Sequence, residues 1–475
     1  MQRILFALSL YTVFSIAAVA QDTGIFSDGF DPLYIAPLFP VVNGKFQLPP
    51  GSSTDQLEWL LGELASGETT TTQEVSAHFV SSFDPANMAT FIGNLRTEFP
   101  NAHIRDVVGV TPYGATVVIQ GDIAANPYGF VVLQTQYTGT KLFTYLYVSD
   151  YYGSVIYPAD TTLTLEQAAD KALTLAPGVS VLVAKIGNDG QCTAITQRNA
   201  TTLRATGSIF KSWILLAMGR MIADGQLSET DIVPLSADKL AEGGQLNSEP
   251  ADTPIPISDL SKFMMGNSDN TATDLMHARV TRDRINAAVD ASGVADPNVL
   301  KPVLDISEQF HLFFSFPLAT AQNYVNGSEA YQNQFLTDDI VPLGNYLGGG
   351  SYDNSSLLTS GSWRATPFDV CKAFSAMRHL PKGSEAIHTV DAAMGAEAAQ
   401  PEVRGNWDRV WYKGGSLLSA ADQYNVLTHA WMLENAGDDP YFLITMYNDD
   451  SGNIDQYAVQ SVAGRMLQLL ATEHP

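Results

Sequence analysis

Hydrophobic residues follow two different periods along the chain, and the change between them predicts where helices give way to strands. Residues 54–99 carry apolar side chains at helical spacing, beginning with Leu57, Leu60, Leu61 and Leu64. After Pro100 the pattern changes to short alternating or continuous apolar runs at 104–110, 115–119, 129–136 and 142–148, with Gly, Pro and Asn between them. Helices followed by strands predict an α+β domain with an antiparallel sheet over residues 51–175.

A second region follows the Pro177-Gly178 break, after a linking helix at 163–175. Its pattern predicts strands first, then a helical middle, then strands again, and a last helix. The expected strands are 179–186, 192–197, 410–412, 426–433 and 441–447, and the expected helices are 213–221, 259–265, 367–380 and 458–471. We predict irregular structure for 305–360. Strands from both ends of the region favour one antiparallel sheet with helices packed against it, in a domain spanning residues 176–475.

The first 50 residues precede both domains. Residues 1–20 have the pattern of a signal peptide: Arg3, then an apolar stretch, then the small residues Ala18-Val19-Ala20. Residues 21–50 are expected to be a loop segment rich in proline. The apolar stretch is short for a membrane anchor, so we expect an exported protein, periplasmic or extracellular, without a stable membrane span after cleavage.

Composition and charge narrow the class of protein. Hydrophobic residues make up 45% of the chain, which is typical of a globular protein. The net charge of −25 argues against nucleic acid as a partner, because phosphates attract a basic surface. Cys192 and Cys371 are the two cysteines, and the sequence leaves open whether they pair. No spacing of Cys or His suggests a metal site, and we expect neither a metal nor a cofactor.

Ser208 and Lys211 are the first candidate catalytic pair. They lie three residues apart at the predicted start of the 213–221 helix, so both side chains can share one face. A helix N-terminus offers free N–H groups, and a buried lysine has a lowered pKa and can act as a base. The motif alone is weak, because Ser236 and Lys239 repeat it in a polar segment.

Two further motifs follow in the chain. Ser268-Asp269-Asn270 lies in an expected turn between helices, and Lys413-Gly414-Gly415-Ser416 ends a predicted strand. In this order and setting, the three motifs resemble those of the penicillin-recognising serine hydrolases, which are class A β-lactamases and penicillin-binding proteins. The resemblance covers residues 178–475 and implies a class A β-lactamase-like α/β catalytic domain. An α+β domain before it is similar to a narrower group, the β-lactamase-like protein of the clavulanic acid biosynthesis cluster and its relatives, whose extra domain is steroid-isomerase-like.

The resemblance implies a role for each motif residue. Ser208 would attack a carbonyl and form an acyl-enzyme, with Lys211 as base. Ser268 would relay a proton to the leaving group, helped by Lys413, and Asn270 would orient the substrate or Lys211. The N–H groups of Ser208 and Ser416 would form the oxyanion hole. The remaining residues expected to bind substrate or support the oxyanion lie on the same strand: Tyr412, Gly415 and the Ser416 side chain.

The sequence departs from the family pattern in two places. Gly414 stands where threonine is usual, and no Glu-x-x-Leu-Asn supplies the deacylating glutamate of class A β-lactamases. Glu308 and Glu329 are the nearest candidates. The leading hypothesis is therefore an exported serine hydrolase acting on β-lactam-like amides or small esters, in β-lactam catabolism or as an esterase. The alternatives are a D-alanyl-D-alanine peptidase and a non-catalytic ligand-binding relative.

Overall fold

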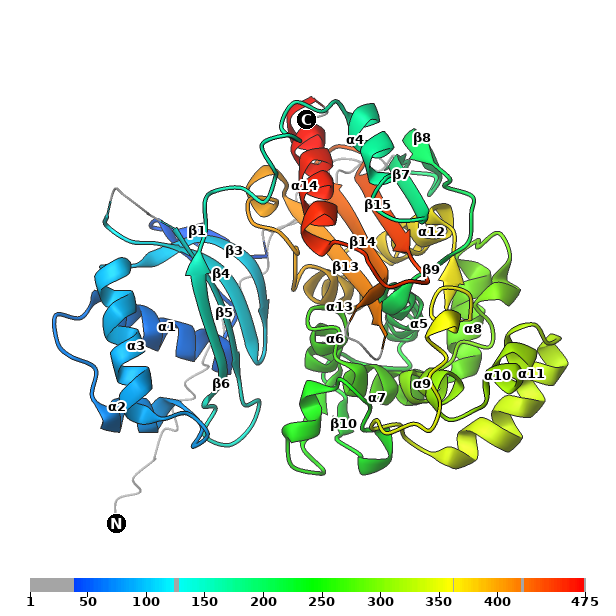
Figure 1. The fold of residues 1–475 in the computed structure, drawn as a ribbon, viewed down its shortest axis with the longest axis horizontal. Coiled ribbons are helices and arrows are strands. Elements are labelled where there is room, and N and C mark those ends of the chain that lie inside the picture. The colour runs from blue at the N-terminus through cyan, green and yellow to red at the C-terminus, as the bar shows by residue number, and fades with distance from the viewer. Residues whose placement is uncertain (1–37, 124–127, 362, 420–422, 474–475) are drawn as a thin grey trace, which may run out of the picture.

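The computed structural model describes residues 38–123, 128–361, 363–419 and 423–473. The predicted signal peptide lies outside these residues. The described chain forms a smaller N-terminal unit beside a larger C-terminal one (Figure 1), a mixed α/β architecture. No helix in the described ranges is long and apolar enough to cross a membrane.

The N-terminal unit is a layer of three helices on a four-stranded antiparallel sheet, as the change of period predicts. Leucines, valines and phenylalanines of both layers form a separate core cluster between them. Figure 1 shows the helices on the outer side and the sheet towards the larger unit. The elements are α1 (Ser52–Ala65), α2 (Thr72–His78), α3 (Pro85–Glu98), β3 (His103–Thr111), β4 (Gly114–Gln120), β5 (Tyr128–Thr135) and β6 (Phe143–Asp150), preceded by the short hairpin β1 (Val41–Val42) and β2 (Lys45–Phe46).

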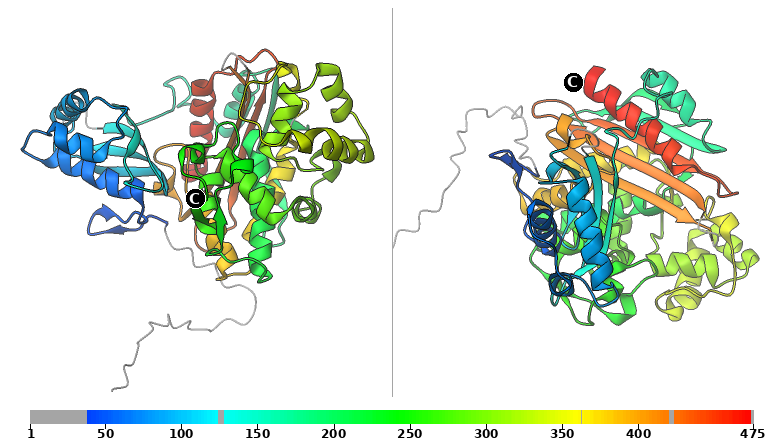
Figure 2. Two further views of the ribbon diagram at one scale, coloured as in Figure 1. Left: turned by 90° about the horizontal axis from the view of Figure 1, so that it is seen from below. Right: turned by 60° about the vertical axis from the view of Figure 1, so that its left-hand side comes forward.

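The larger unit is built on one five-stranded antiparallel sheet that joins strands from both ends of the region, as predicted. Two helices cover one face, and helices from the middle of the chain pack against the other (Figures 1 and 2). The order across the sheet is β13 (Arg409–Leu418), β14 (Tyr424–Glu434), β15 (Tyr441–Asn448), β7 (Gly178–Ile186) and β8 (Cys192–Arg198). The first face carries α4 (Leu165–Ala172) and α14 (Gln456–Glu473).

The helical middle contains more regular structure than the sequence predicts. Its helices are α5 (Lys211–Ala223), α6 (Ile257–Met265), α7 (Asn270–Val280), α8 (Arg282–Ala291), α9 (Ile306–Phe314), α10 (Leu318–Val325), α11 (Glu329–Phe335), α12 (Pro367–Arg378) and α13 (Glu385–Met394). Short strand pairs complete it: β9 (Arg204–Ala205) with β12 (Arg364–Ala365), and β10 (Ile232–Pro234) with β11 (Pro254–Pro256). A disulfide between Cys192 and Cys371 ties β8 to α12, which answers the question that the sequence leaves open.

The prediction of irregular structure at 305–360 is wrong where α9, α10 and α11 form. These helices are only 7–9 residues long, too short for a clear period among the many Asn and Gly residues. They are held by tertiary packing in a small apolar cluster of their own that includes Leu312, Tyr324 and Phe335.

Helix α4 packs with the larger unit, although the predicted domain boundary at residue 176 lies after it. Leu165, Ala168 and Ala172 are buried in the same core cluster as residues of α14 and β7. Just upstream, Asp160 accepts a hydrogen bond from Ser461 Oγ of α14 at 2.6 Å. The boundary itself stays a prediction.

A chain that begins at residue 155 should therefore be more stable than one that begins at 176. Removing α4 uncovers apolar residues of α14 and the sheet, and the free energy of unfolding should fall by several kcal/mol at about 25 cal/mol per Å² exposed. Thermal unfolding of the two shortened proteins measures the difference. Equal melting temperatures would show that α4 adds nothing to this core, and failure of both to fold would make the N-terminal unit indispensable.

Candidate active site

Ser208 lies in a single 3₁₀ turn, Gly207–Phe210, that leads directly into α5. The turn is pressed against the sheet. Phe210 stacks on Trp363 with ring centroids 3.8 Å apart, and Thr206 O accepts a hydrogen bond from Thr428 Oγ1 of β14 at 2.8 Å. The result is a half-buried serine on a rigid turn, at the positive end of a buried helix.

Glycine at position 415 allows this close approach. A Cβ on Gly415 would lie 2.2 Å from Thr206 O and 2.7 Å from Ser208 N. Conversely, a Cβ on Gly207 would lie 2.7 Å from Ser416 N. The backbone around Ser208 N and Ser416 N therefore comes together, and these are the two N–H groups that the family resemblance implies for the oxyanion hole.

Lys211 is fully buried and holds the Ser-Asp-Asn turn through three hydrogen bonds. Its Nζ donates to Ser268 O at 2.6 Å, to Ser268 Oγ at 3.2 Å and to Asn270 Oδ1 at 2.9 Å. Three acceptors match the three protons of an ammonium group. Asn270 thus orients Lys211, while its own Nδ2 donates to Glu242 O at 2.6 Å. Within the described residues no hydrogen bond joins Lys211 to Ser208 Oγ, and such contacts often form only with substrate bound.

Lys413 reaches the same serine from the sheet. Its Nζ donates to Ser268 Oγ at 3.0 Å and to Gly414 O at 2.7 Å. Ser268 Oγ therefore lies between two lysine amines. Hydrogen bonds bring together Lys211, Ser268, Asn270 and Lys413, and the backbone N of Ser208 lies close to Gly415 of the same strand as Lys413. Ser236 and Lys239 of the repeated motif lie elsewhere, in and just before a short 3₁₀ turn whose lysine approaches Asp305.

Burial sets the protonation of the two lysines. It lowers the pKa of Lys211 to about 7, although the carboxylates of Asp269 and Asp274 act in the opposite direction. Burial and the nearby Lys211 lower the pKa of Lys413 well below its usual value, opposed by Glu397. At neutral pH a large fraction of Lys211 is thus an uncharged amine that can accept a proton.

The rate of acylation of Ser208 should therefore rise with pH through about 7, as Lys211 loses its proton. Lys211→Arg keeps the charge but cannot supply a neutral base, and it should lower the acylation rate constant by about 10²–10⁴-fold. Stopped-flow measurement between pH 5 and 9 gives both results, with Lys239→Arg as the matched control. A Lys211→Arg rate equal to wild type would leave Lys211 with an electrostatic role only.

Glu397 is a half-buried carboxyl near Lys413 that the motifs do not reveal. It follows α13 in a stretch of small residues, and its Oε1 accepts from Ala398 N at 3.0 Å and from Ala399 N at 2.7 Å. Burial raises the pKa of Glu397 to about 7. No sequence pattern could have identified it, because its position depends on how the two units meet.

Folding raises the Glu397 pKa above its unfolded value of 4.5, so the folded protein holds this proton more tightly than the unfolded chain. Stability should then fall as the pH rises from about 4.5 to 7. Glu397→Gln removes this term, and its melting temperature relative to wild type should increase by about 2–4 °C between pH 5 and pH 8. Glu329→Gln, at an exposed position, is the control. A constant difference between variant and wild type would contradict the assignment.

Tyr412 and Gly414 lie on the other face of β13 from Lys413. Tyr412 packs in the cluster beneath α14, and its hydroxyl hydrogen-bonds to His429 Nδ1 at 2.7 Å. A Cβ on Gly414 would lie only 2.2 Å from that hydroxyl. The tyrosine thus occupies the space that threonine would need, which explains the glycine. A cavity of about 270 Å³ is lined by both residues together with Ser268, Lys413 and Ser416, so substrate contact by Tyr412 stays a prediction.

Neither candidate glutamate is positioned to act as the deacylating base. Glu308 caps α9 together with Asp305, and its Oε2 accepts from Arg282 at 2.6 Å. Glu329 lies exposed in the first turn of α11. Because Glu308 forms this ion pair and caps the helix, it has a structural role.

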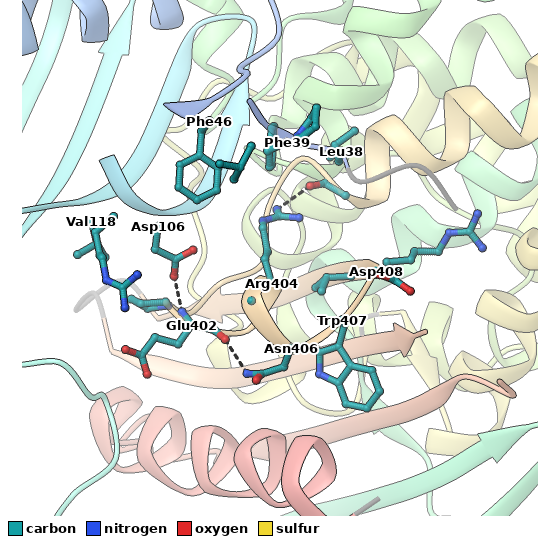
Figure 3. A pocket seen from close by; sticks show the side chains of 18 of the residues that line it. Leu38, Phe39, Phe46, Asp106, Val118, Glu402, Arg404, Asn406, Trp407 and Asp408 are labelled. Atoms are coloured by element: carbon teal, nitrogen blue, oxygen red, sulfur yellow. Dashed lines mark hydrogen bonds between the residues drawn. The ribbon is translucent and has the colours of Figure 1, made fainter. Parts of the chain in front are cut away.

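A larger cavity, about 770 Å³, lies between the two units and contains none of the predicted catalytic residues. Figure 3 shows Arg404 at its centre, beside Phe39, with Asp106 and Glu402 joined by a hydrogen bond on one side. Cavity size alone would therefore not have identified the site that contains the predicted catalytic residues. In the described ranges no group of three or more His, Cys, Asp or Glu residues could hold a metal ion.

A model of the beta-lactamase enzyme family matches residues 164–332, which carry Ser208, Lys211, Ser268 and Asn270. The larger unit is thus β-lactamase-like. Similar solved structures are a β-lactamase from Chitinophaga pinensis (TM-score 0.44, 13% identity, 65% of this chain and 98% of that one) and one from Sphaerobacter thermophilus (0.43, 17%, 66% and 98%). A third is an acyl-enzyme of the penicillin-binding protein PBP-A with penicillin G (0.41, 12%, 65% and 97%).

No curated protein matches this chain. The family match begins at residue 164 and does not include the N-terminal unit. The narrower resemblance and the steroid-isomerase-like shape therefore stay predictions.

Proposed function

We propose that this protein is a serine hydrolase that transfers acyl groups to Ser208 from β-lactam-like amides or small esters. The observation that carries the proposal is Ser268 Oγ, held 3.2 Å from Lys211 Nζ and 3.0 Å from Lys413 Nζ beside the Ser208 turn. A hydroxyl between a buried base and a second amine is suited to carry a proton from nucleophile to leaving group.

Acylation would proceed as follows. Ser208 Oγ attacks the substrate carbonyl carbon while Lys211 Nζ takes the hydroxyl proton, and the N–H groups of Ser208 and Ser416 stabilise the oxyanion. The carbonyl C–N or C–O bond then breaks. The proton passes through Ser268 to the departing nitrogen or oxygen, and the acyl group stays on Ser208 as an ester.

Deacylation is expected to be the slow step. It needs a base that activates water, and Glu308 is occupied by Arg282 and the start of α9. General-base help is worth about 10²–10⁴-fold in rate. An opened β-lactam also keeps its leaving group attached, whereas the alcohol of an ester departs, so esters should turn over faster.

We place the protein in an exported setting, periplasmic or extracellular. The signal-peptide pattern of residues 1–20 supports this, and so does the disulfide between Cys192 and Cys371, since such bonds persist in oxidising compartments.

Mixing the protein with a chromogenic cephalosporin should give a burst of about one equivalent followed by slow turnover. Intact-mass spectrometry should show the adduct on wild type and none on Ser208→Ala. Ser236→Ala, in the repeated motif, is the matched control and should label fully. Labelling of Ser208→Ala at wild-type strength would refute the nucleophile, and rapid β-lactam turnover without an adduct would refute slow deacylation.

A further inference from the structure

A two-residue loop carries Tyr113 out of the N-terminal sheet and into the core of the larger unit. The loop joins β3 to β4, and α6 of the larger unit lies beside this sheet (Figure 1). Tyr113 is 4% exposed and shares its core cluster with residues of α5, α6 and α7. A side chain from one unit is thus part of the other unit's interior.

Tyr113 contacts the Ser-Asp-Asn turn directly. Its ring stacks on Phe263 of α6 with centroids 4.5 Å apart, and its hydroxyl donates to Asp269 Oδ2 at 3.3 Å. The other donors to the Asp269 carboxylate are backbone groups: Gln245 N at 2.7 Å, Leu246 N at 3.0 Å and Ala272 N at 2.7 Å. In the described part of the chain, Tyr113 is the one side chain that donates to this carboxylate.

The turn needs such support because its backbone is strained. Ser268 has a φ of 57°, a left-handed conformation that a residue with a Cβ adopts at a cost. Strained conformations persist where the surroundings over-determine them. This conformation places Ser268 Oγ between Lys211 and Lys413, and the next residue, Asp269, anchors the turn to its neighbours.

The loop that presents Tyr113 is itself fixed within the N-terminal unit. Ser52 Oγ donates to Pro112 O at 2.8 Å, Ser53 Oγ donates to Thr111 O at 2.6 Å, and Tyr113 O accepts from Thr135 N at 2.7 Å. On the opposite side, Gly266 precedes the turn, and a Cβ there would lie 2.8 Å from Thr111 Cγ2. Both surfaces are therefore shaped for close contact at this place.

We propose that the N-terminal unit is a working part of the hydrolase, in which Tyr113 is a positioning residue that holds Ser268 in register with the two lysines. The proposal rests on the proposed function of Ser208 as nucleophile. Residues 51–150 would then contribute to catalysis without touching the substrate, and the two units would act as one catalyst.

The rest of the interface allows a specific test. The units are also joined by main-chain bonds between β3 and residues 396–398, at 2.9 Å from Val110 N to Ala396 O and from Ala398 N to Val108 O. Arg404 adds bonds to Val107 O and Val108 O. Removing one hydroxyl therefore leaves the units docked.

Tyr113→Phe keeps the ring on Phe263 and deletes only the hydroxyl. Tyr137→Phe is the matched control, because Tyr137 also lies at the interface, packs edge-on against Phe263 and donates to Asp259 Oδ2 at 3.0 Å, outside the motif. Single-turnover acylation by a fluorophosphonate or a chromogenic cephalosporin separates the saturating rate constant from the half-saturating concentration. We expect the rate constant to fall about fivefold to tenfold in Tyr113→Phe, with the half-saturating concentration unchanged and Tyr137→Phe within twofold of wild type. Both variants lose one hydrogen bond to a carboxylate, so their melting temperatures should fall by similar amounts.

Hydrogen exchange of the amides of residues 266–272 gives a readout independent of activity, and these amides should exchange faster in Tyr113→Phe alone. Equal acylation and exchange in wild type and Tyr113→Phe would overturn the proposal. Equal losses in both variants would also overturn it, since they would indicate general loosening of the interface. If wild type is not labelled at Ser208, the proposed function fails, and the exchange measurement still decides whether Tyr113 holds the turn.

Discussion

The larger unit depends on one constraint: the Lys211 amine is taken out of water and must still find hydrogen-bond partners. Lowering the pKa from 10.5 to about 7 corresponds to a cost on the order of 5 kcal/mol for the charged form. This cost is what remains after the nearby charge of Asp269 has offset part of the desolvation, and the three acceptors from Ser268 and Asn270 hold the amine in place. Two of these acceptors belong to the strained turn at Ser268, so the protonation of Lys211 depends on the shape of that turn. Contacts that hold Asp269 in place therefore also affect the pKa of Lys211.

The same constraint reaches the sheet. Lys413 can share Ser268 Oγ only if β13 comes close to the Ser208 turn, and Gly415 allows that approach. On the opposite face, Tyr412 fills the space above Gly414 and shares a hydrogen bond with His429. The two glycines of this motif are therefore required for different reasons, one on each face of the strand. Gly415 leaves room for the Ser208 turn, and Gly414 stands in place of the usual threonine because Tyr412 fills the space beside it.

Periodicity could predict the sheet and most helices, and the spacing of Ser208 and Lys211 on one helix start could predict that pair, because each depends on local pattern. That Ser268, Asn270 and Lys413 join the pair could be predicted only through the resemblance of the three motifs to a known family. Other features could not be predicted, because they depend on contacts between distant segments. Helices α9–α11 are stabilised by packing against one another, Glu397 acquires its perturbed pKa at the meeting of two units, and the disulfide joins residues 179 positions apart. Tyr113 stands in an ordinary β-hairpin loop, and nothing in its neighbours along the chain indicates Asp269 as its partner.

In the proposed mechanism, the shared hydroxyl of Ser268 sets the direction in which a proton would move. A hydroxyl has one hydrogen and two lone pairs. When both lysines are charged, each donates to Ser268 Oγ, both lone pairs are occupied, and its hydrogen is free to point outward at a leaving group. When Lys211 is neutral it has a lone pair to receive the proton of Ser208. Once that proton is on Lys211, both lysines are charged again, and the Ser268 hydroxyl can donate its hydrogen to the leaving group. In the proposed mechanism, this geometry would couple attack at one end of the site to protonation at the other, provided that the turn keeps Ser268 Oγ within reach of both amines.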